Sequence, residues 1–551
     1  MTRARGGPDH AAMQAEVIAT GGRIFRGLAG GLAEALALAR GRVLAVGRRA
    51  EIEELAGPGT RRLDLAGRVA IPAFHEAHMH LLPLGLVLSQ VSLRAPAVRR
   101  LEDILDRLRE AAARSAPGEW VLGAGYDHAA LAEARHPTAA ELDLAVPDRP
   151  AFIMRACGHM GVANSMALRA AGIGPQTPDP PGGVIDRLGG SPTGLLQERA
   201  LHLIQRAMPA PSRARLIEAI AAAGRHLAEQ GFASASDMNV GMTAGLAEIA
   251  AYREAAESGC LLQRMWLVLA GNPEGIAADA VAAGLRPWRR GDDPAALLRC
   301  GAVKVFADGS AGGLTAAFFD PYLAADTRGV LTFPAEEMHA LLARYHAEGW
   351  QLAIHAIGDA AIEQVLSGME ALGTTPDRRH RIEHCGFATP DQRRRMRARG
   401  ILPVPQPVFM YEFGDLYLRN LGRERAERAY PMRSWLREGQ HPSASSDAPV
   451  CPTDPFLNLF AMVTRQTSQG SLLGPEERLT LPEALHCATW CGAYASFVED
   501  RRGALEPGMD ADIAVLSQDI FASSVEALPS TRCDITLRGG VVIYDRHREL
   551  S

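Results

Sequence analysis

Ile71-Pro-Ala-Phe-His-Glu-Ala-His-Met-His-Leu81 is the stretch on which the predicted fold and function depend. It follows an apolar run and contains two histidines, His78 and His80, that lie two residues apart. Side chains at i and i+2 of an extended strand point to the same face, so both imidazoles can reach one metal ion. We therefore expect later strand ends to supply the remaining ligands.

Composition and charge limit the kinds of molecule that the protein is expected to bind. Of the 551 residues, 47% are apolar and 22% are charged, as in ordinary globular proteins with a sizeable core. The net charge of -5 and the pI near 6.4 give no basic footprint for nucleic acid or an anionic membrane. The sequence shows neither a membrane-spanning segment nor a signal peptide. We predict a cytoplasmic protein that binds a small molecule, and homo-oligomer formation stays open.

The eight cysteines are scattered and include no CxxC pair. This pattern favours free thiols in a reducing compartment over a disulfide framework. Cys487 and Cys491 lie four apart on a predicted helix, and we expect a packing role for both.

The middle of the chain alternates β-rich apolar runs with longer helical segments, which is typical of βαβ units around a parallel sheet. Helices are predicted at 211–230, 335–348 and 390–399. The alternation predicts an α/β fold with a (β/α)8 TIM-like barrel. Its eight strands are predicted at Arg68–His75, Phe232–Asp237, Arg264–Leu269, Ala302–Phe306, Gln351–His355, His380–His384, Ile401–Val404 and Pro442–Ser446.

Short strands at both chain ends predict a small β-sandwich domain assembled from the two termini. A flexible tail, 1–14, precedes its first part, 15–67, and its second part is 501–551. The barrel occupies 68–500. About 150 residues separate the first two barrel strands, far more than an ordinary βα loop contains. We interpret 92–203 as a large inserted lobe over the barrel mouth.

The ends of the predicted strands carry an ordered series of metal-binding side chains, where barrel enzymes place their active sites. Four histidines and an aspartate suit a borderline-soft divalent ion such as zinc. A lysine amine can add carbon dioxide to give a carbamate that bridges two metals, so one ion and two ions both stay open. The aspartate is predicted to bind metal and to take a proton from metal-bound water. The series is His78, His80, Lys304, His355, His384 and Asp447.

Each of these residues has a structural alternative when it is taken alone. A single histidine at a strand end is usually a hydrogen-bonded structural residue, and Lys304 alone would form a salt bridge. Asp447, before Ala-Pro, would cap a helix or turn. The ordered series at successive strand ends favours the metal site over these alternatives.

Over nearly its whole length the sequence resembles the amidohydrolase superfamily, and within it the branch of N-substituted formamide deformylases. The resemblance implies a metal-dependent barrel joined to a two-part β-sandwich. The matching stretches are Pro72–Leu81, Gly123–Asp127, Pro137–Leu142, Gly158–Ser165, Val303–Ser310, Thr315–Ala317, Arg381–His384, Gln406-Pro407, Ser446–Pro449 and Gly508–Ile513.

The stretch before the two histidines departs from the family pattern. The usual Gly-Phe-x-Asp is here Ala73-Phe-His-Glu76, so the acid is one methylene longer. By strand alternation His75 points away from the face of His78 and His80, and we expect it to be structural. The role of Glu76 stays open.

Four residues are candidates for contact with the substrate. His159 matches a family position near the reacting group, where it would polarise the carbonyl or hold the leaving group; an ordinary loop histidine is the alternative. Tyr126 and Asp127 follow a Gly-x-Gly turn that would bring them to the same mouth. Asp308 lies just past Lys304 and is expected to orient it or to face the substrate.

These features predict a metal-dependent amidohydrolase that cleaves a non-peptide carbon–nitrogen bond in an amide, formamide or cyclic amide. Metal-activated water would add to the carbonyl with Asp447 as base and His159 as a further catalytic residue. The same ligands would also serve deamination, ester hydrolysis or decarboxylation. A non-catalytic regulatory barrel is the third alternative, and the complete ligand series argues against it.

Overall fold

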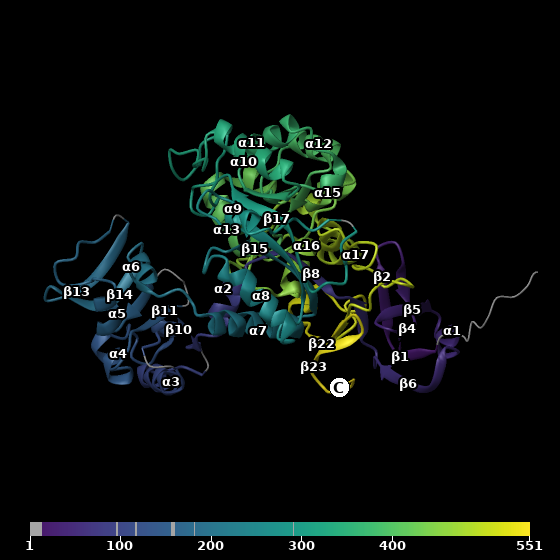
Figure 1. Cartoon of the computed structure of the whole chain (residues 1–551), viewed down its shortest axis with the longest axis horizontal. Helices are drawn as coiled ribbons and strands as arrows, with labels where there is room; N and C mark the ends of the chain where they lie inside the picture. The colour runs from purple at the N-terminus through teal and green to yellow at the C-terminus, as the bar shows by residue number, and fades with distance from the viewer. Residues whose placement is uncertain are drawn as a thin grey trace, which may run out of the picture. The chain divides into compact units, whose positions relative to one another are not determined.

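The structure is a computed structural model that describes residues 14–94, 97–115, 118–155, 160–180, 182–289 and 291–550. The chain divides into two compact units (Figure 1). The first unit combines the chain up to Leu82 with the chain from Ala223 onward, and the second unit is Pro83–Ala222. The predicted tail lies outside the described residues except for Gln14. The domain boundaries given above remain predictions.

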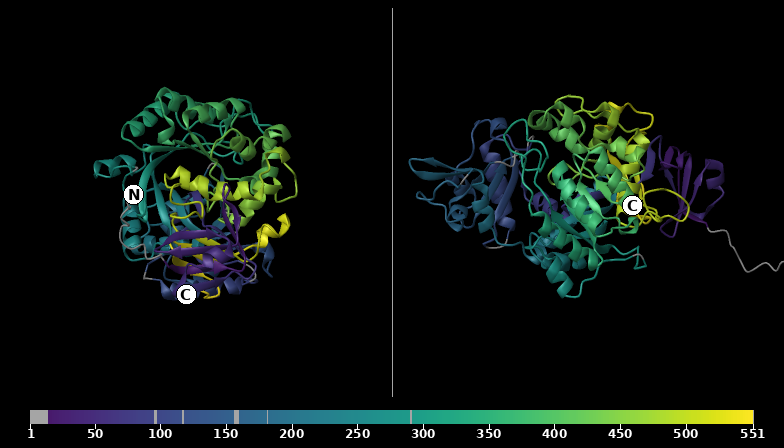
Figure 2. Two further views of the ribbon diagram at one scale, coloured as in Figure 1. Left: turned by 90° about the vertical axis from the view of Figure 1, so that its right-hand side faces the viewer. Right: turned by 90° about the horizontal axis from the view of Figure 1, so that it is seen from above.

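A parallel sheet of seven strands curls into a nearly closed barrel in the first unit, and helices cover its outer face (Figures 1 and 2). Sheet order follows chain order from β8 through β15 to β20, as βαβ connections produce. The predicted mixed α/β class is confirmed. The strands are β8 (Phe74–Met79), β15 (Phe232–Val240), β16 (Arg264–Ala270), β17 (Leu298–Phe306), β18 (Gln351–Ala356), β19 (Arg381–His384) and β20 (Leu402–Val404).

The first predicted strand, Arg68–His75, is wrong as a single element. Val69–Pro72 forms β7, which pairs with strands of a different sheet, and β8 begins at Phe74. Between them, the Ala73 N–H binds the carbonyl of Asp512. Pro72 has no N–H with which to continue a ladder of backbone hydrogen bonds. Because the apolar residues on both sides of it are buried, hydrophobicity alone did not show where one strand ends and the next begins.

The eighth predicted strand, Pro442–Ser446, is not a strand in the structure. The segment 443–448 nevertheless spans the gap between β20 and β8, and we call it the closing segment. Ser443 and Ser445 donate backbone hydrogen bonds to the carbonyls of Pro403 and Pro405 (3.2 and 3.1 Å), while Asp447 donates to the His78 carbonyl (2.8 Å). Pro403 and Pro405 have no N–H to donate in return. The closing segment and the chain of these two prolines therefore do not form a full ladder of backbone hydrogen bonds.

The predicted helices agree closely with α7 (Arg213–Glu229), α10 (Ala335–Ala347) and α12 (Pro390–Arg399). Local signals fix α12, because Thr389 and Gln392 form a capping box and Gly400 ends the helix at φ 64°. The other helices of this unit beyond β15 are α8 (Ala247–Glu257), α9 (Ala277–Ala282), α11 (Asp359–Ala371), α13 (Val408–Leu421), α14 (Arg423–Glu427), α15 (Met432–Arg437), α16 (Pro455–Thr464), α17 (Leu481–Ala488) and α18 (Trp490–Ala495).

The first unit contains two further sheets, whose strands are seen in Figure 2. Buried apolar residues of both sheets form one core. The four-stranded sheet has the order β5-β4-β1-β6, and the six-stranded sheet β23-β22-β21-β7-β2-β3 combines N-terminal and C-terminal strands, as predicted. Their strands are β1 (Ala15–Thr20), β2 (Arg23–Gly27), β3 (Gly31–Ala33), β4 (Ala35–Ala39), β5 (Arg42–Gly47), β6 (Ala56–Asp64), β7 (Val69–Pro72), β21 (Ile513–Leu516), β22 (Cys533–Arg538) and β23 (Val541–Asp545).

The second unit contains a six-stranded sheet in the order β13-β14-β12-β11-β10-β9, with its own apolar clusters. Its helices include α3 (Leu101–Arg114), α4 (Ala139–Ala145), α5 (Ser165–Ala170) and α6 (Leu201–Ala207). The strands are β9 (Val91–Ser92), β10 (Val121–Tyr126), β11 (Ala151–Arg155), β12 (Met160–Ala163), β13 (Gly183–Leu188) and β14 (Ser191–Glu198).

Two expectations concern the chain as a whole. Among the described residues, no helix has the length and apolar character needed to cross a membrane. The seven cysteines that the structure describes are free thiols, in agreement with the absence of a disulfide framework.

Candidate metal centre

His78 and His80, at the carboxyl end of β8, direct one ring nitrogen each toward a common point. The Nδ1 of His78 lies 2.6 Å from Glu383 Oε2, and the Nδ1 of His80 lies 3.0 Å from the carbonyl oxygen of Met238. An imidazole that donates from Nδ1 carries its lone pair on Nε2. Both Nε2 atoms are 3.2 Å from Asp447 Oδ1.

Asp447 completes this convergence at the end of the closing segment. Its backbone adopts φ 58°, and its Oδ1 is buried with no hydrogen-bond donor in the described structure. Three lone-pair atoms in a buried space repel one another unless a cation lies between them. This arrangement fits a divalent metal ion.

Lys304 and His384 lie beside the same point. Lys304, on β17, places its Nζ 3.3 Å from His78 Nε2, and burial lowers its pKa to about 8. His384 ends β19, and its Nδ1 is 2.6 Å from Gln406 Oε1, which leaves its Nε2 free. The ligand atoms of His78, His384 and Asp447 all lie within 4.8 Å of one another. The structure thus brings together residues that are hundreds of positions apart in the chain.

His355, at the end of β18, lies next to His384 with ring centroids 4.4 Å apart. Its Nε2 is 3.0 Å from the carbonyl oxygen of Gly309 and 3.2 Å from Asp308 Oδ1. Its Nδ1 is buried without a hydrogen-bond partner in the described structure. Nδ1 is therefore the nitrogen available for a metal, and ligation by His355 remains a prediction.

Glu76, whose role the sequence left open, holds the two ligand-bearing segments together. Its Oε1 accepts hydrogen bonds from the backbone N–H groups of His78 (3.2 Å) and Ser446 (3.0 Å). Burial raises the pKa of Glu76 to about 8. Glu76 stands two residues before His78 and therefore on the same strand face. This spacing is the sequence signal that could have indicated the contact.

Glu383 and Gln406 are further residues that orient the ligands. Glu383 accepts two hydrogen bonds from Arg381 (2.7 and 2.9 Å) in addition to its contact with His78. A buried ion pair between Arg381 and Glu383 thus lies behind the ligands. Gln406 was noted only as part of a matching stretch, and its contact with His384 required the folded chain.

His75 lies apart from these ligands. Its ring is buried, its Nε2 is 3.3 Å from Ser496 Oγ, and its side chain packs against Gly492 of α18. Burial, together with the charges of nearby arginines, lowers the pKa of His75 well below its ordinary value. The contacts agree with a structural role.

The four predicted substrate contacts have different surroundings. Asp308 is fully engaged, because its carboxylate accepts backbone N–H groups of Ala317, Ile357 and Gly358 at 2.9–3.0 Å. It therefore holds His355 and two loops in place, and its predicted contact with substrate stays a prediction. His159 lies outside the described residues.

Tyr126 and Asp127 belong to the second unit. The Tyr126 hydroxyl is 2.9 Å from His136 Nδ1, and its ring is buried in the core of that unit. Asp127 caps a short 3-10 helix, His128–Ala130, and pairs with Arg155 at 2.7 Å. Substrate contact by either residue remains a prediction.

An aromatic wall stands beside His384. The ring of Phe409, on α13, is stacked with the His384 imidazole at 6.1 Å between centroids. Phe413 and Tyr430 contact Phe409 at 5.1 and 6.1 Å. One side of the centre is thus apolar and rigid.

A buried set of histidines, an aspartate and a lysine at the carboxyl ends of barrel strands defines a metal-dependent hydrolase. Residues 61–544 match the model of the amidohydrolase family, and the chain belongs to that family. The predicted resemblance is confirmed.

Two relatives and one solved structure illustrate the similarity. N-substituted formamide deformylase of Arthrobacter pascens is 31% identical over 531 residues, which cover 93% of this chain and 95% of the relative. Protein LONG AFTER FAR-RED 3 of Arabidopsis thaliana is 29% identical over 536 residues, covering 94% and 90%. The crystal structure of an uncharacterized metal-dependent hydrolase from Pyrococcus furiosus aligns with a TM-score of 0.75 and 28% identity, covering 91% of this chain and 99% of that chain.

Proposed function

We propose that this chain hydrolyses a non-peptide carbon–nitrogen bond in an amide, formamide or cyclic amide. The observation that carries the proposal is Asp447 Oδ1, buried without a hydrogen bond and 3.2 Å from the Nε2 atoms of both His78 and His80. This position supports a role for the carboxylate both in binding a cation and in exchanging a proton beside it. The relative named N-substituted formamide deformylase supports the choice of bond.

The metal would be held by the predicted set of His78, His80, Lys304, His355, His384 and Asp447, with zinc suited to these ligands. Such an ion acidifies water and polarises a carbonyl oxygen. Asp447 takes one proton from the attacking water and returns it to the leaving nitrogen, so that amide and water give acid and amine. His159 would assist at the carbonyl or at the leaving group.

A carbamate on Lys304 is part of the proposal. Burial lowers the pKa of Lys304 to about 8, which increases the share of neutral amine that can add carbon dioxide. A bridging carbamate would supply an additional oxygen ligand between two ions. Supplying bicarbonate during metal loading should then raise the number of ions bound per chain, and Lys304→Ala should bind the same number with or without it.

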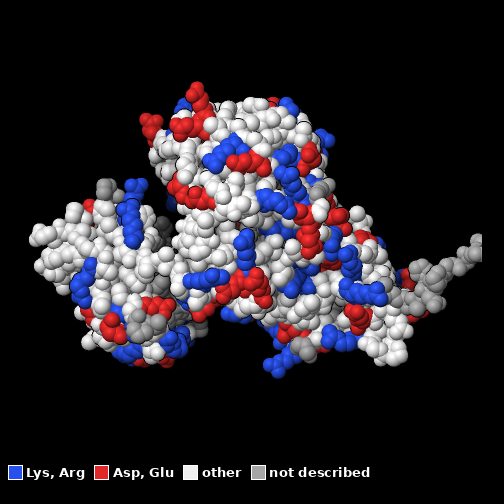
Figure 3. All heavy atoms as spheres, in the orientation of Figure 1, with Lys and Arg blue, Asp and Glu red and all other residues white. Residues whose placement is uncertain are grey.

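The aromatic wall supports a preference for an apolar group on the substrate. The Phe409 and Phe413 rings offer no hydrogen bonds, so a polar substituent that contacts them would lose its water there without compensation. Lys and Arg side chains are interspersed with Asp and Glu on the face shown in Figure 3, which supports a small-molecule partner over a polyanion. A cytoplasmic location remains a prediction.

A substrate panel tests the proposed reaction. N-substituted formamides, secondary amides, cyclic amides, esters and amidines are assayed with the chelator-stripped protein and after reloading with zinc. Hydrolysis of the first three classes, lost on stripping and restored by zinc, is expected. Activity confined to esters or amidines would overturn the choice of bond, and equal activity without metal would overturn the centre. Asp447→Ala is the inactive control.

A further inference from the structure

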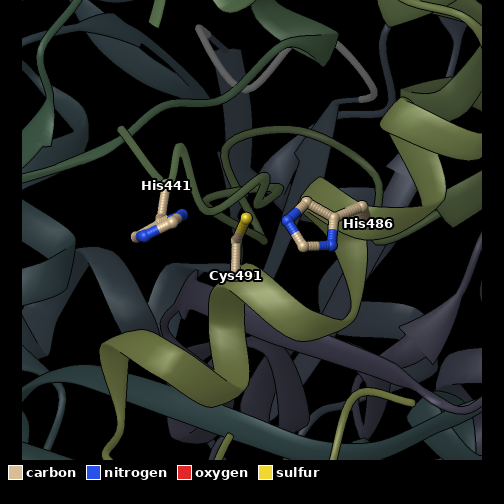
Figure 4. A group of neighbouring side chains, drawn as sticks. All are labelled: His441, His486 and Cys491. Carbon is tan, nitrogen blue, oxygen red and sulfur yellow. The ribbon is translucent and has the colours of Figure 1, made fainter. Parts of the chain in front are cut away.

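A second group of metal-binding side chains lies at the other end of the closing segment. His441 precedes that segment, His486 belongs to α17 and Cys491 to α18. Their ligand atoms all lie within 4.8 Å of one another, and the Cys491 sulfur points between the two imidazoles (Figure 4). Among the described residues, the only other such group is the one containing Asp447.

A break in the helix creates this group. The sequence predicted one helix through Cys487 and Cys491, but α17 ends at Ala488 and α18 starts after Thr489, whose backbone is not helical (φ −128°, ψ −76°). On an unbroken helix, side chains five residues apart point roughly 140° away from each other. The single-helix expectation is therefore wrong, and the break is what brings His486 to the Cys491 sulfur.

Backbone carbonyls on both sides of this break are hydrogen-bonded to the closing segment. The N–H of Ala444 binds the carbonyl of Cys487 (3.0 Å), and the Ser443 hydroxyl donates to the carbonyl of Cys491 (2.9 Å). The backbone around the group is thus held on two sides, so the three side chains start from fixed positions.

The two imidazoles carry unused ligand atoms. In the described part of the chain, the ring nitrogens of His441 and His486 form no hydrogen bond with protein. Neutral imidazole and cysteine sulfur are the ligands that zinc and related transition metals bind, with a fourth position left for water.

Aromatic packing is the alternative explanation for the two histidines. His486 is stacked on Trp490 (5.0 Å between centroids), while His441 lies 5.1 Å from Trp490 and 4.5 Å from Tyr494. These contacts account for the positions of the rings, but they do not require two imidazoles to flank a sulfur. By holding the rings there, the packing prepares the ligand set before any ion arrives.

We propose that His441, His486 and Cys491 bind a second, thiophilic divalent transition-metal ion, separate from the centre at Asp447. When the ion binds, the S–H bond of Cys491 breaks, sulfur keeps the electron pair for the metal, and the proton passes to solvent. The six residue-to-residue steps from His441 to Asp447 span roughly 20 Å if the chain is fully extended. The ion would fasten α17 and α18 to the start of the closing segment that delivers Asp447.

Cobalt(II) substitution provides the test, since a thiolate ligand gives a charge-transfer band in the near ultraviolet that histidine and carboxylate ligands do not give. The full chain is stripped with chelator and titrated with cobalt(II). The band is expected in the wild type and in His78→Ala, which impairs the other centre. Cys260→Ser, which removes an exposed thiol far away in sequence, is the matched control and should keep the band.

Cys491→Ser is expected to lose the band and to bind one ion fewer per chain. Because Cys491 is buried and its replacement could disturb folding, His486→Asn, at a half-buried position, is the second variant. It should weaken the cobalt(II) affinity read from the band by more than about ten-fold. Absence of the band in the wild type, or an unchanged band in both variants, would overturn the proposal.

Discussion

Glu383→Gln is expected to weaken metal binding by about 10- to 100-fold and to destabilise the fold by about 3 kcal/mol. The carboxylate fixes the Nδ1 of His78 at 2.6 Å and neutralises Arg381, and all three side chains are buried. Glutamine keeps the size but loses the charge, and its amide nitrogen would face a donor. Arg381 would then be a buried cation without its counter-ion.

The expected loss of stability follows from the ionisation of Glu383. Burial alone raises its pKa, but the Arg381 charge and the His78 hydrogen bond outweigh it and lower the pKa from 4.5 to about 2. Lowering the pKa from 4.5 to about 2, at about 1.36 kcal/mol for each unit, stabilises the fold by about 3 kcal/mol. Because the folded pKa is the lower one, this contribution is full above pH 4.5 and disappears as the pH falls toward 2. The glutamine variant should lack this pH-dependent contribution.

Metal affinity is measured by competition with a chromogenic chelator, and stability by urea denaturation of the stripped protein. Asp512→Asn is the matched control, because Asp512 forms a buried pair with Arg264 (2.7 Å) and holds no metal-centre residue. It should lose comparable stability and keep wild-type metal affinity. Unchanged metal affinity in Glu383→Gln, or an equal loss in Asp512→Asn, would refute the reasoning.

Four further variants probe the centre and its support. His78→Ala or Asp447→Ala should abolish turnover while circular dichroism stays that of the wild type; normal activity in either would contradict the site assignment. Gln406→Leu removes the acceptor 2.6 Å from His384 Nδ1 and should lower metal affinity by about ten-fold or more, measured by chelator competition. Gly358→Ala would place a methyl group 1.9 Å from the Ala317 carbonyl oxygen and should lower the melting temperature. Gly59→Ala, at a position with open space and without a left-handed backbone, is the control and should leave the melting temperature close to that of the wild type.

Local sequence signals predicted much of the fold. Strand and helix alternation depends on periodicity, and α12 is bounded by Thr389, Pro390 and Gly400, which act within one turn of the chain. The two-residue spacing of His78 and His80 likewise needs only an extended backbone. These features could be predicted because the physics that fixes them is local.

The boundaries between sheets could not be predicted in this way. Val69–Pro72 and β8 form one buried apolar run, and only pairing with β2 and β21 assigns the first part to another sheet. The closing segment takes an extended course because of its hydrogen-bonded neighbours, two of which are prolines. Both depend on contacts between distant parts of the chain.

The sequence by itself determined the strand and helix order, the family resemblance and the series of candidate ligands. Only the tertiary structure decided which atoms face one another: Glu76 bridging two segments, Gln406 and Glu383 turning the imidazoles, and Cys491 lying between two histidines. The physical reason is the distance along the chain over which each interaction acts. Periodicity and capping act over a few residues, whereas the direction of a ring nitrogen depends on partners that folding brings from far along the chain.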